Sequence, residues 1–379
     1  MSDKKIIFYT IISYCMIFLY IDPFTNGLGR KIQTVFTAIM LTFVLFSNKS
    51  FLRVQAFKPI NYATYILITS LIITSFTNIN LKLGDYNVSS YTLGLLYALI
   101  LFSFLFFIEY IRFNKRTNLI FKYFFYLSLL TCIIIDILIF TIGSPITAYY
   151  FIGDKFTISY LHIFTCTLYY FFKHPKKLLF FLLISLSITI STYLECSTGL
   201  IGTIIVFILL LKPNYKALFG AKKTLLYVLI FSSLSFFFSE LTKFSFIQYL
   251  IQDVLNEDLT LTGRTSIYTI LLDALANNKL FGWGQGNGMF YLGYYYKTPN
   301  AQNGLFNYIT DYGIIGAISL LFLIYIIYKK IKIKQAYPLL ALIFTFIVLS
   351  SVEITFNLQF IAYLMLLIPF TIKYKQIKI

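Results

Sequence analysis

Residues Tyr91 to Ile111 read YTLGLLYALILFSFLFFIEYI, a stretch with a single charged side chain, Glu109. A helix needs about 20 consecutive apolar residues to cross the hydrocarbon core of a bilayer. It also satisfies its backbone hydrogen bonds internally, which lipid requires. The stretch therefore predicts a transmembrane helix over 91–111.

Apolar runs of this kind recur along the chain of 379 residues, which is 59% hydrophobic and only 12% charged. Soluble domains are nearer one quarter charged. We therefore predict an all-α, polytopic integral membrane protein with a single membrane domain over 1–379. The pattern predicts twelve transmembrane helices, of which the pair 178–194 and 197–211 is short and separated only by Glu195-Cys196. The spans are expected near 6–21, 32–47, 60–77, 91–111, 119–141, 157–172, 178–194, 197–211, 224–239, 306–328, 336–351 and 354–372.

Lysine and arginine predict the orientation, because positive residues stay on the cytoplasmic side. With the N-terminus inside and the spans alternating, the inside segments hold 23 of the 31 basic residues. Both termini are then cytoplasmic in a bacterial plasma (inner) membrane, and the first apolar run is an uncleaved span. The net charge of +17 follows from this bias. It implies no nucleic-acid partner.

One long hydrophilic stretch, residues 240–306, interrupts the apolar pattern and is predicted to be a large extracytoplasmic loop. Apolar residues at helical spacing within it predict an amphipathic helix near 265–279, which could lie on the bilayer surface. Gly263-Arg264 stands where that helix begins. Free N–H groups and the helix dipole favour an anion there, and a guanidinium suits phosphate oxygens. The alternative is an arginine that anchors to lipid head groups.

Two further groups of polar residues follow in the same loop. Gly282-x-Gly284-x-Gly286 does not follow a strand of a βαβ unit, so it fails the context test for a nucleotide-binding loop. It is either a tight turn or a close approach of backbone to ligand. Trp283 either stacks on a sugar or belongs to the interfacial aromatic belt. Gln302-Asn303 precedes the tenth span and either contacts sugar hydroxyls or caps that helix.

Outside this loop, five residues are further candidates. Asp154 and Lys155 lie in the outer loop before the sixth span, and His162 lies two helical turns further on. Either Lys155 or His162 could face the same cavity as Arg264. Asp136, within the fifth span, is a functional candidate because carboxylates are costly inside a membrane. The alternative for both His162 and Asp136 is a packed polar group. Glu195 is exposed at the short outer turn before Ser197-Thr198-Gly199.

The four cysteines lie in or beside apolar runs and form no C-x-x-C pair, so we expect inert packing residues, with no metal site and no disulfide framework. A Ser/His/Asp hydrolase pattern, a Walker loop and a His-rich metal motif are also absent from the sequence. An enzymatic reaction must therefore depend on the outer residues.

Together these features resemble the O-antigen polymerase (Wzy) and O-antigen ligase family. The family plan has many spans, a large late outer loop with Gly-Arg, an amphipathic helix and a Gly-x-Gly turn, and then His-Asn before a span that starts near Gly-Ile-Ile-Gly. The chain matches it over roughly 150–330, with generic spans before that. The matching segments are Gly263-Arg264, residues 265–279, Phe281-Gly282-Trp283-Gly284, Gln302-Asn303 and Gly313-Ile314-Ile315-Gly316, with weaker matches at Gly153-Asp154-Lys155, Ser159-Tyr160 and Ser197-Thr198-Gly199.

The resemblance implies glycosyl transfer on the outer face, from a glycan on polyprenyl pyrophosphate to a sugar hydroxyl of a second lipid-linked unit. The leaving pyrophosphate drives the reaction, so no ATP and no cofactor are implied. Membrane lipid, a chain-length regulator and a flippase are the further partners. Arg264 and then Lys155 would stabilise the pyrophosphate; Asp154, Glu195 and His162 are acid/base candidates; and Gly263, Trp283, Gly284, Gln302 and Asn303 are candidates for substrate contacts.

One departure from the family separates the alternatives. Ligases have a histidine where this chain has Gln302, and glutamine cannot act as a general base. This favours a polymerase over a ligase. A flippase or exporter of lipid-linked oligosaccharide is the transport alternative, although such proteins usually show two similar halves, which the sequence lacks. A multi-span acyltransferase would want a base in an early span, which is also missing.

Overall fold

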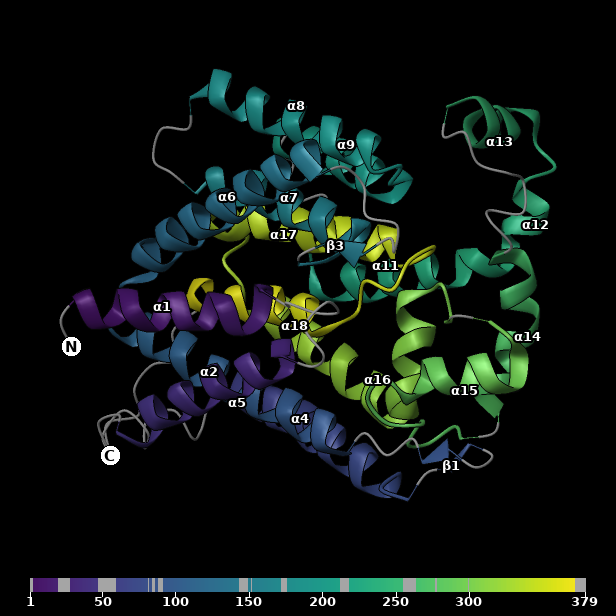
Figure 1. The fold of residues 1–379 in the computed structure, drawn as a ribbon, viewed down its shortest axis with the longest axis horizontal. Coiled ribbons are helices and arrows are strands. Elements are labelled where there is room, and N and C mark those ends of the chain that lie inside the picture. Colours follow the sequence, from purple (N-terminus) through teal and green to yellow (C-terminus); the bar gives the residue numbers. More distant parts are fainter. Residues whose placement is uncertain are drawn as a thin grey trace.

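The structure is a computed structural model that describes residues 3–19, 28–46, 59–80, 82–83, 86–87, 91–142, 149–150, 152–171, 176–211, 218–254, 264–276, 278–298 and 300–371. These residues form an all-α fold with two short hairpins (Figure 1). The main helices are α1 (Asp3–Phe18), α2 (Leu28–Leu45), α4 (Pro59–Thr77), α5 (Tyr91–Phe113), α6 (Thr117–Ile142), α7 (Lys155–Tyr169), α8 (Lys177–Tyr193), α9 (Ser197–Leu211), α11 (Ala221–Leu234), α14 (Arg264–Ala276), α15 (Asn287–Tyr296), α16 (Gly304–Lys330), α17 (Ile333–Leu349) and α18 (Leu358–Leu366).

Shorter elements complete the described chain. The helices α12 (Phe238–Leu241) and α13 (Ser245–Tyr249) follow a 3-10 turn over Ser235–Phe237 and precede a π-helical turn over Leu250–Val254. A second 3-10 turn covers Ile368–Phe370. The antiparallel hairpins pair β1 (Lys82–Leu83) with β2 (Tyr86–Asn87) and β3 (Tyr149–Tyr150) with β4 (Gly153–Asp154).

Four of the described helices are long and apolar enough to cross a membrane: α4, α5, α6 and α16. They coincide with the spans predicted near 60–77, 91–111, 119–141 and 306–328, which indicates a membrane protein. The predicted total of twelve spans is wrong, because only these four described helices have the length and apolar composition of a span. The physical reason is length, since α8, α9 and α17 have 17, 15 and 17 residues. At 1.5 Å per residue they reach about 26 Å or less, short of the ~30 Å core.

Helix α6 carries an exposed apolar face, which also fits a lipid environment. Leu130, Ile134, Ile137 and Phe140 recur at helical spacing, and each is exposed by 47–57%. A continuous apolar face of this kind is unusual on a soluble protein and marks an interaction surface, here suited to lipid.

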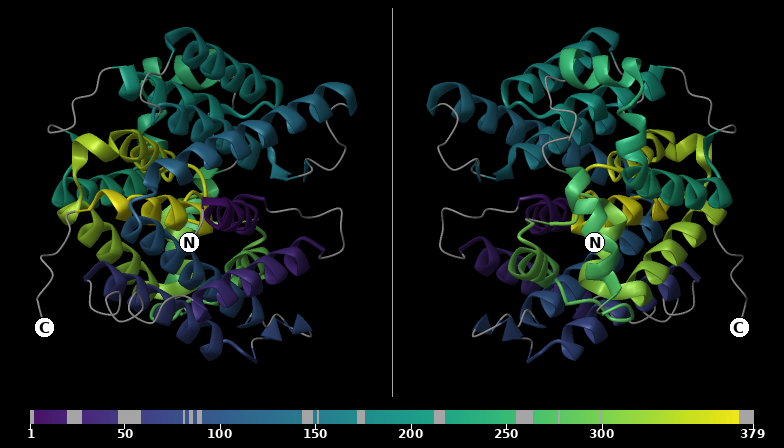
Figure 2. Two further views of the ribbon diagram at one scale, coloured as in Figure 1. Left: turned by 90° about the vertical axis from the view of Figure 1, so that its left-hand side faces the viewer. Right: turned by 90° about the vertical axis from the view of Figure 1, so that its right-hand side faces the viewer.

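The helices pack in layers. In Figure 1, α6–α9 form the upper layer and α2, α4 and α5 the lower one, with α1, α17 and α18 between them, and Figure 2 shows the same order from two sides. Helix α16 packs between α4 and α11. One large apolar core joins these helices, and a smaller cluster around Leu271 and Leu292 holds α14 and α15 together.

The start of α1 marks one end of the bundle, which we call the N-terminal end. Asp3 forms an ion pair of 3.2 Å with Arg116, in the turn between α5 and α6. The nearby Arg112 donates to the carbonyl of Thr371 at 3.2 Å, and Thr371 pairs with Ile331 after α16. Segments predicted to be cytoplasmic therefore meet at this end.

The opposite end, which we call the loop end, carries α12–α15 (Figure 1). Asn78, after α4, donates to the carbonyl of Gly282 at 3.0 Å. Gly304 donates its N–H to the carbonyl of Ser350 at 2.8 Å. Segments predicted to be extracytoplasmic therefore meet here, and the predicted site residues lie among them.

Candidate functional site

The turn before α7 is fixed by Asp154. Its Oδ1 accepts hydrogen bonds from both the N–H and the hydroxyl of Thr157, each at 2.8 Å. A carboxylate at this position satisfies a free N–H of the first helical turn and complements the helix dipole. Asp154 is therefore the N-cap of α7, and its second oxygen is left to act on other groups.

Lys155 connects this turn to a second predicted motif. Its ammonium nitrogen donates to the carbonyl oxygen of Glu195 at 2.7 Å. Glu195 has a left-handed backbone (φ 51°) in the turn between α8 and α9, and its side chain is exposed. The fold thus brings Asp154, Lys155 and Glu195 together across 40 residues of chain. An ammonium has three donors, so Lys155 keeps two for a ligand.

Gly199, in the first turn of α9, packs directly against α7 and α8. A Cβ atom there would lie 2.5 Å from the Cβ of Ser159 and 2.9 Å from the hydroxyl of Ser191. The two serines are hydrogen-bonded to each other at 3.3 Å. The Ser-Thr-Gly motif therefore serves close helix packing, which sets the position of the 195–199 turn beside Lys155.

The Gly-x-Gly turn is docked on α16 by its backbone. The N–H groups of Trp283 and Gly284 donate to the carbonyls of Thr310 and Asp311 at 2.8 and 2.7 Å. Both Gly282 and Gly284 have positive φ, which glycine adopts without strain. This docking determines the conformation of the turn. The N–H group of Gly284 is bonded to α16 and is therefore not available to a ligand.

Helix α16 is broken where this turn meets it. Gly313 has φ 66° and ψ −173°, a conformation outside the helical region. The N–H groups of Ile314 and Ile315 donate instead to the carbonyls of Lys279 and Leu280, at 2.8 and 3.3 Å. Broken helices occur in membrane proteins where other protein groups satisfy the freed backbone, and they often border binding sites.

Asp311 and Trp283 secure the same junction. Oδ1 of Asp311 accepts the N–H of Gly288 at 3.0 Å, in the first turn of α15. The ring of Trp283 stacks on Tyr291, with centroids 4.0 Å apart and planes at 18°. Trp283 is half-buried, so one part of its ring remains available to a ligand.

Asn303 is the N-cap of α16. Its Oδ1 accepts the N–H of Phe306 at 3.1 Å, while its Nδ2 donates to Ser232 and Ser235, both at 2.9 Å. The side chain is completely buried. These contacts account for Asn303 as a capping residue, which was one of the two expectations.

Gln302 and α14 meet beside this cap. The hydroxyl of Tyr268 donates to the carbonyl of Gln302 at 2.9 Å and lies 3.4 Å from the carbonyl of Ser351. Arg264 begins α14, one turn before Tyr268. Its side chain, and Gly263 as a whole, lie outside the described residues.

His162, in α7, pairs with Asp136 of α6. Its Nε2 is 3.2 Å from Oδ2 of Asp136, and its Nδ1 is 3.0 Å from the carbonyl of Ile158. A carbonyl only accepts, so Nδ1 carries a proton. Both side chains of the pair are buried. The structure therefore joins α6 to α7 through this pair.

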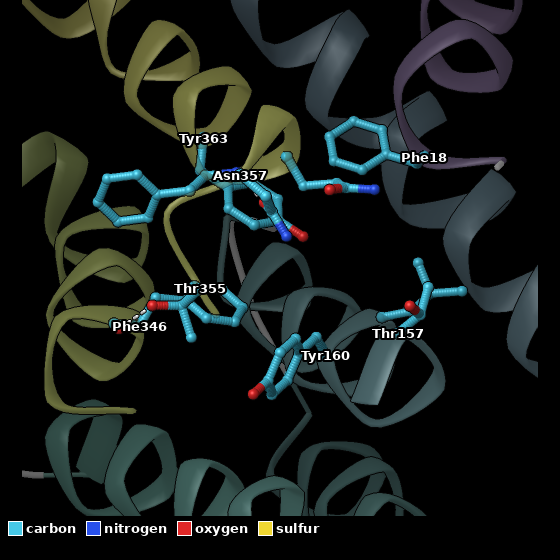
Figure 3. A pocket seen from close by; sticks show the side chains of 10 residues that line it. Phe18, Thr157, Tyr160, Phe346, Thr355, Asn357 and Tyr363 are labelled. Carbon is cyan, nitrogen blue, oxygen red and sulfur yellow. Dashed lines mark hydrogen bonds between the residues drawn. The ribbon is translucent and has the colours of Figure 1, made fainter. Parts of the chain in front are cut away.

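A pocket at the loop end was missed by sequence reasoning. It holds about 450 Å³ of empty space, its open side included, between α1, α7, α17 and α18 (Figure 3). Tyr160 and Thr157 line it from the Asp154 turn, and Thr355 and Asn357 line it from the connector 350–357. The remaining lining residues are Phe18, Leu161, Phe346, Gln359, Phe360 and Tyr363.

The connector itself carried a sequence signal. Ser350, Ser351, Glu353 and Thr355 stand between two apolar runs, and all four are buried. Oε1 of Glu353 accepts the N–H of Ile354 at 3.3 Å. A buried carboxylate at a membrane boundary is a functional candidate. The sequence signal is this group of polar residues between two apolar runs. The turn over 195–199 has the same pattern.

The chain matches no family model, no curated protein and no solved structure in the three comparisons. Within the described ranges, no three His, Cys, Asp or Glu side chains gather where they could hold a metal ion.

Proposed function

We propose that this protein polymerises lipid-linked oligosaccharide repeat units on the outer face of a bacterial plasma membrane, as a membrane glycosyltransferase. One observation carries the proposal. The separate segments 153–160, 195–199, 302–304 and 350–359 converge at the loop end, which Tyr268 also joins to α14. Three of these segments carry part of the resemblance to the O-antigen polymerase and ligase family, namely Gly153-Asp154-Lys155, Ser159-Tyr160, Ser197-Thr198-Gly199 and Gln302-Asn303.

The orientation supports an outer site. The N-terminal end gathers the start of α1 and the turns after α5 and α16, which carry Arg112, Arg116 and Lys329–Lys330. Positive residues stay in the cytoplasm. The loop end then faces outward, away from nucleotide sugars, and uses a donor already attached to polyprenyl pyrophosphate. Both termini are cytoplasmic in this proposal.

The proposed reaction is a displacement at the anomeric carbon of the donor glycan. An acceptor hydroxyl oxygen forms the new bond to this carbon, and the bond to the pyrophosphate oxygen breaks. Polyprenyl pyrophosphate leaves with the bonding electrons, and the hydroxyl proton passes to a carboxylate. No cofactor enters these steps.

Each residue takes a role that its surroundings permit. Arg264, at the start of α14, and Lys155 stabilise the charge that develops on the leaving pyrophosphate. Asp154 is the base that we favour, because its second oxygen has no hydrogen-bond partner in the described part of the chain and Thr157 lies at the pocket. Glu195 is the alternative base. Trp283 and Gln302 remain candidates for sugar contacts.

Arg264→Ala tests the proposal in a deletion strain complemented with the full chain. We expect normal amounts of the protein in the membrane and surface glycan reduced to single repeat units. Arg264→Lys keeps the charge without the fork and should give short chains, while the exposed Lys279→Ala should behave as wild type. A normal length distribution for Arg264→Ala would remove Arg264 from the mechanism.

The deletion strain also separates the alternative functions. A polymerase deletion leaves single units on the outer side, and a flippase or exporter deletion leaves them on the inner leaflet. A ligase deletion leaves long chains attached to the carrier lipid. Long carrier-linked chains, or units held inside, would overturn the polymerase assignment.

A further inference from the structure

The pocket between α7 and α18 has a floor of aromatic rings. Tyr363 stacks on Phe346, with centroids 5.4 Å apart and planes at 9°, and on Phe18 at 5.6 Å. Tyr160 meets Phe346 edge-on at 5.0 Å. Phe18, Phe346 and Tyr363 are buried against one another, so they give the pocket an apolar and uncharged floor.

Amide and hydroxyl groups surround this floor. Oδ1 of Asn357 accepts the N–H of Phe360 at 3.1 Å, which leaves its NH₂ group without a partner among the described residues. The half-exposed amide of Gln359 has no hydrogen bond within the same part of the chain. Thr157 and Thr355 add two hydroxyls. Neutral donors and acceptors around an apolar floor suit the hydroxyl and amide groups of a sugar.

The side chains that line the pocket are neutral, and its charged neighbours in the chain carry both signs. Asp154 is bonded to Thr157, and the buried Glu353 is two residues from Thr355. The ammonium of Lys155 is directed to the carbonyl of Glu195. Lys155 does not line the pocket, so a carboxylate or pyrophosphate inside it would lose its hydration without a direct contact to a cation, which is unfavourable.

From these observations we propose that this pocket binds an uncharged sugar ring, and that this ring belongs to the acceptor glycan. The assignment to the acceptor rests on the proposed function. The preference for an uncharged sugar does not, since it follows from the lining alone.

The test is a binding measurement on the full chain in lipid nanodiscs, by saturation-transfer NMR. The probes are the methyl glycosides of glucose, galactose and N-acetylglucosamine, and methyl glucuronoside. We expect at least one neutral glycoside to bind at least ten times more tightly than the glucuronoside. Gln359→Ala should weaken that binding at least five-fold.

A charge substitution gives the sharper result. Gln359→Lys places a cation at the pocket and should strengthen glucuronoside binding at least five-fold. Gln252→Lys makes the same chemical change at an exposed residue outside the pocket and should change nothing. The idea is overturned if no neutral glycoside binds, if the glucuronoside binds wild type as well as the neutral sugars do, or if Gln359→Lys leaves the preference unchanged.

The outcome separates this inference from the proposed function, because binding is measured without polymerisation. Neutral sugars that bind, together with normal chain lengths in the deletion strain, would retain the pocket and reject the polymerase. Single repeat units in the deletion strain, with no sugar bound at the pocket, would support the polymerase and reject the sugar-binding pocket.

Discussion

Gly313 fixes the junction between the Gly-x-Gly turn and the broken helix α16, and Gly313→Ala should release it. A Cβ atom at this position would lie 2.1 Å from the carbonyl oxygen of Leu280 and 2.6 Å from the nitrogen of Phe281. Both are backbone atoms, so a side-chain rotation cannot relieve the clash. The turn over residues 278–284 must move away from α16.

The expected cost combines two effects. The conformation at φ 66° and ψ −173° is accessible essentially only to glycine, so alanine adds about 1–3 kcal/mol of strain. Moving the turn also breaks the bonds from Ile314 to Lys279 and from Ile315 to Leu280, each contributing about 0.5–1.5 kcal/mol. We expect the docking of the turn to weaken by roughly 2–6 kcal/mol in total.

Trp283 reports this change directly, because it is the only tryptophan in the chain and lies in the turn. In detergent-solubilised Gly313→Ala protein, its emission should shift to longer wavelength and acrylamide should quench it more strongly. Far-UV circular dichroism should change little at the same temperature, because the undocking is local.

Gly293→Ala is the matched control. Gly293 lies inside α15, where a Cβ would meet only the carbonyl oxygen of Thr298, at 3.8 Å. Alanine there should leave Trp283 fluorescence unchanged and favour the helix by up to ~1 kcal/mol. If Gly313→Ala shows the emission and quenching of wild type, the turn is not held by this junction and the reasoning is wrong.

Three further predictions concern buried polar groups. Asn303→Ala removes the cap of α16 and the two donated hydrogen bonds, so thermal unfolding in detergent should show that the free energy of unfolding falls by about 2–4 kcal/mol. Asn303→Asp keeps the cap and should lose less stability. Equal losses in the two variants would contradict the capping role. Asp136→Ala should destabilise by about 3–5 kcal/mol, because it leaves His162 buried alone. Asp136→Asn should lower the free energy of unfolding less than Asp136→Ala does, since the asparagine amide can donate to the neutral Nε2 of His162. A larger loss for Asp136→Asn would refute the pairing. Burial raises the pKa of Cys196, so its reactive thiolate is scarce at pH 8. Maleimide should therefore label Cys196 only after denaturation. Labelling of Cys196 in the folded protein would contradict this prediction.

The positions of the long helices were accessible from the sequence. The runs at 60–77, 91–111, 119–141 and 306–328 became α4, α5, α6 and α16, with ends that differ by two residues or fewer. Each depends on about 20 consecutive apolar residues, which is local information. The total of twelve spans failed where the apolar runs are short, since α8 and α9 follow the predicted bounds closely but have only 17 and 15 residues.

The polar motifs could be found in the sequence, whereas their partners could not. Gly282-x-Gly284 was recognised as a tight turn, but its docking on Thr310 and Asp311 joins positions about 27 residues apart on a broken helix. Nothing local in Gly313-Ile314-Ile315-Gly316 indicates that the helix breaks there. Lys155 and Glu195 were separate candidates until the packing of Gly199 on α7 brought their turns together.

The sequence by itself determined that this is a helical protein with helices long and apolar enough to cross a membrane and a polar region before α16, because apolar run length and composition act residue by residue. Tertiary structure alone decided which polar groups share a site. It paired His162 with Asp136, turned Asn303 into a cap, and formed a pocket from Phe18, Tyr160 and Tyr363. Those contacts depend on the packing of helices far apart in the chain, which short-range patterns do not encode.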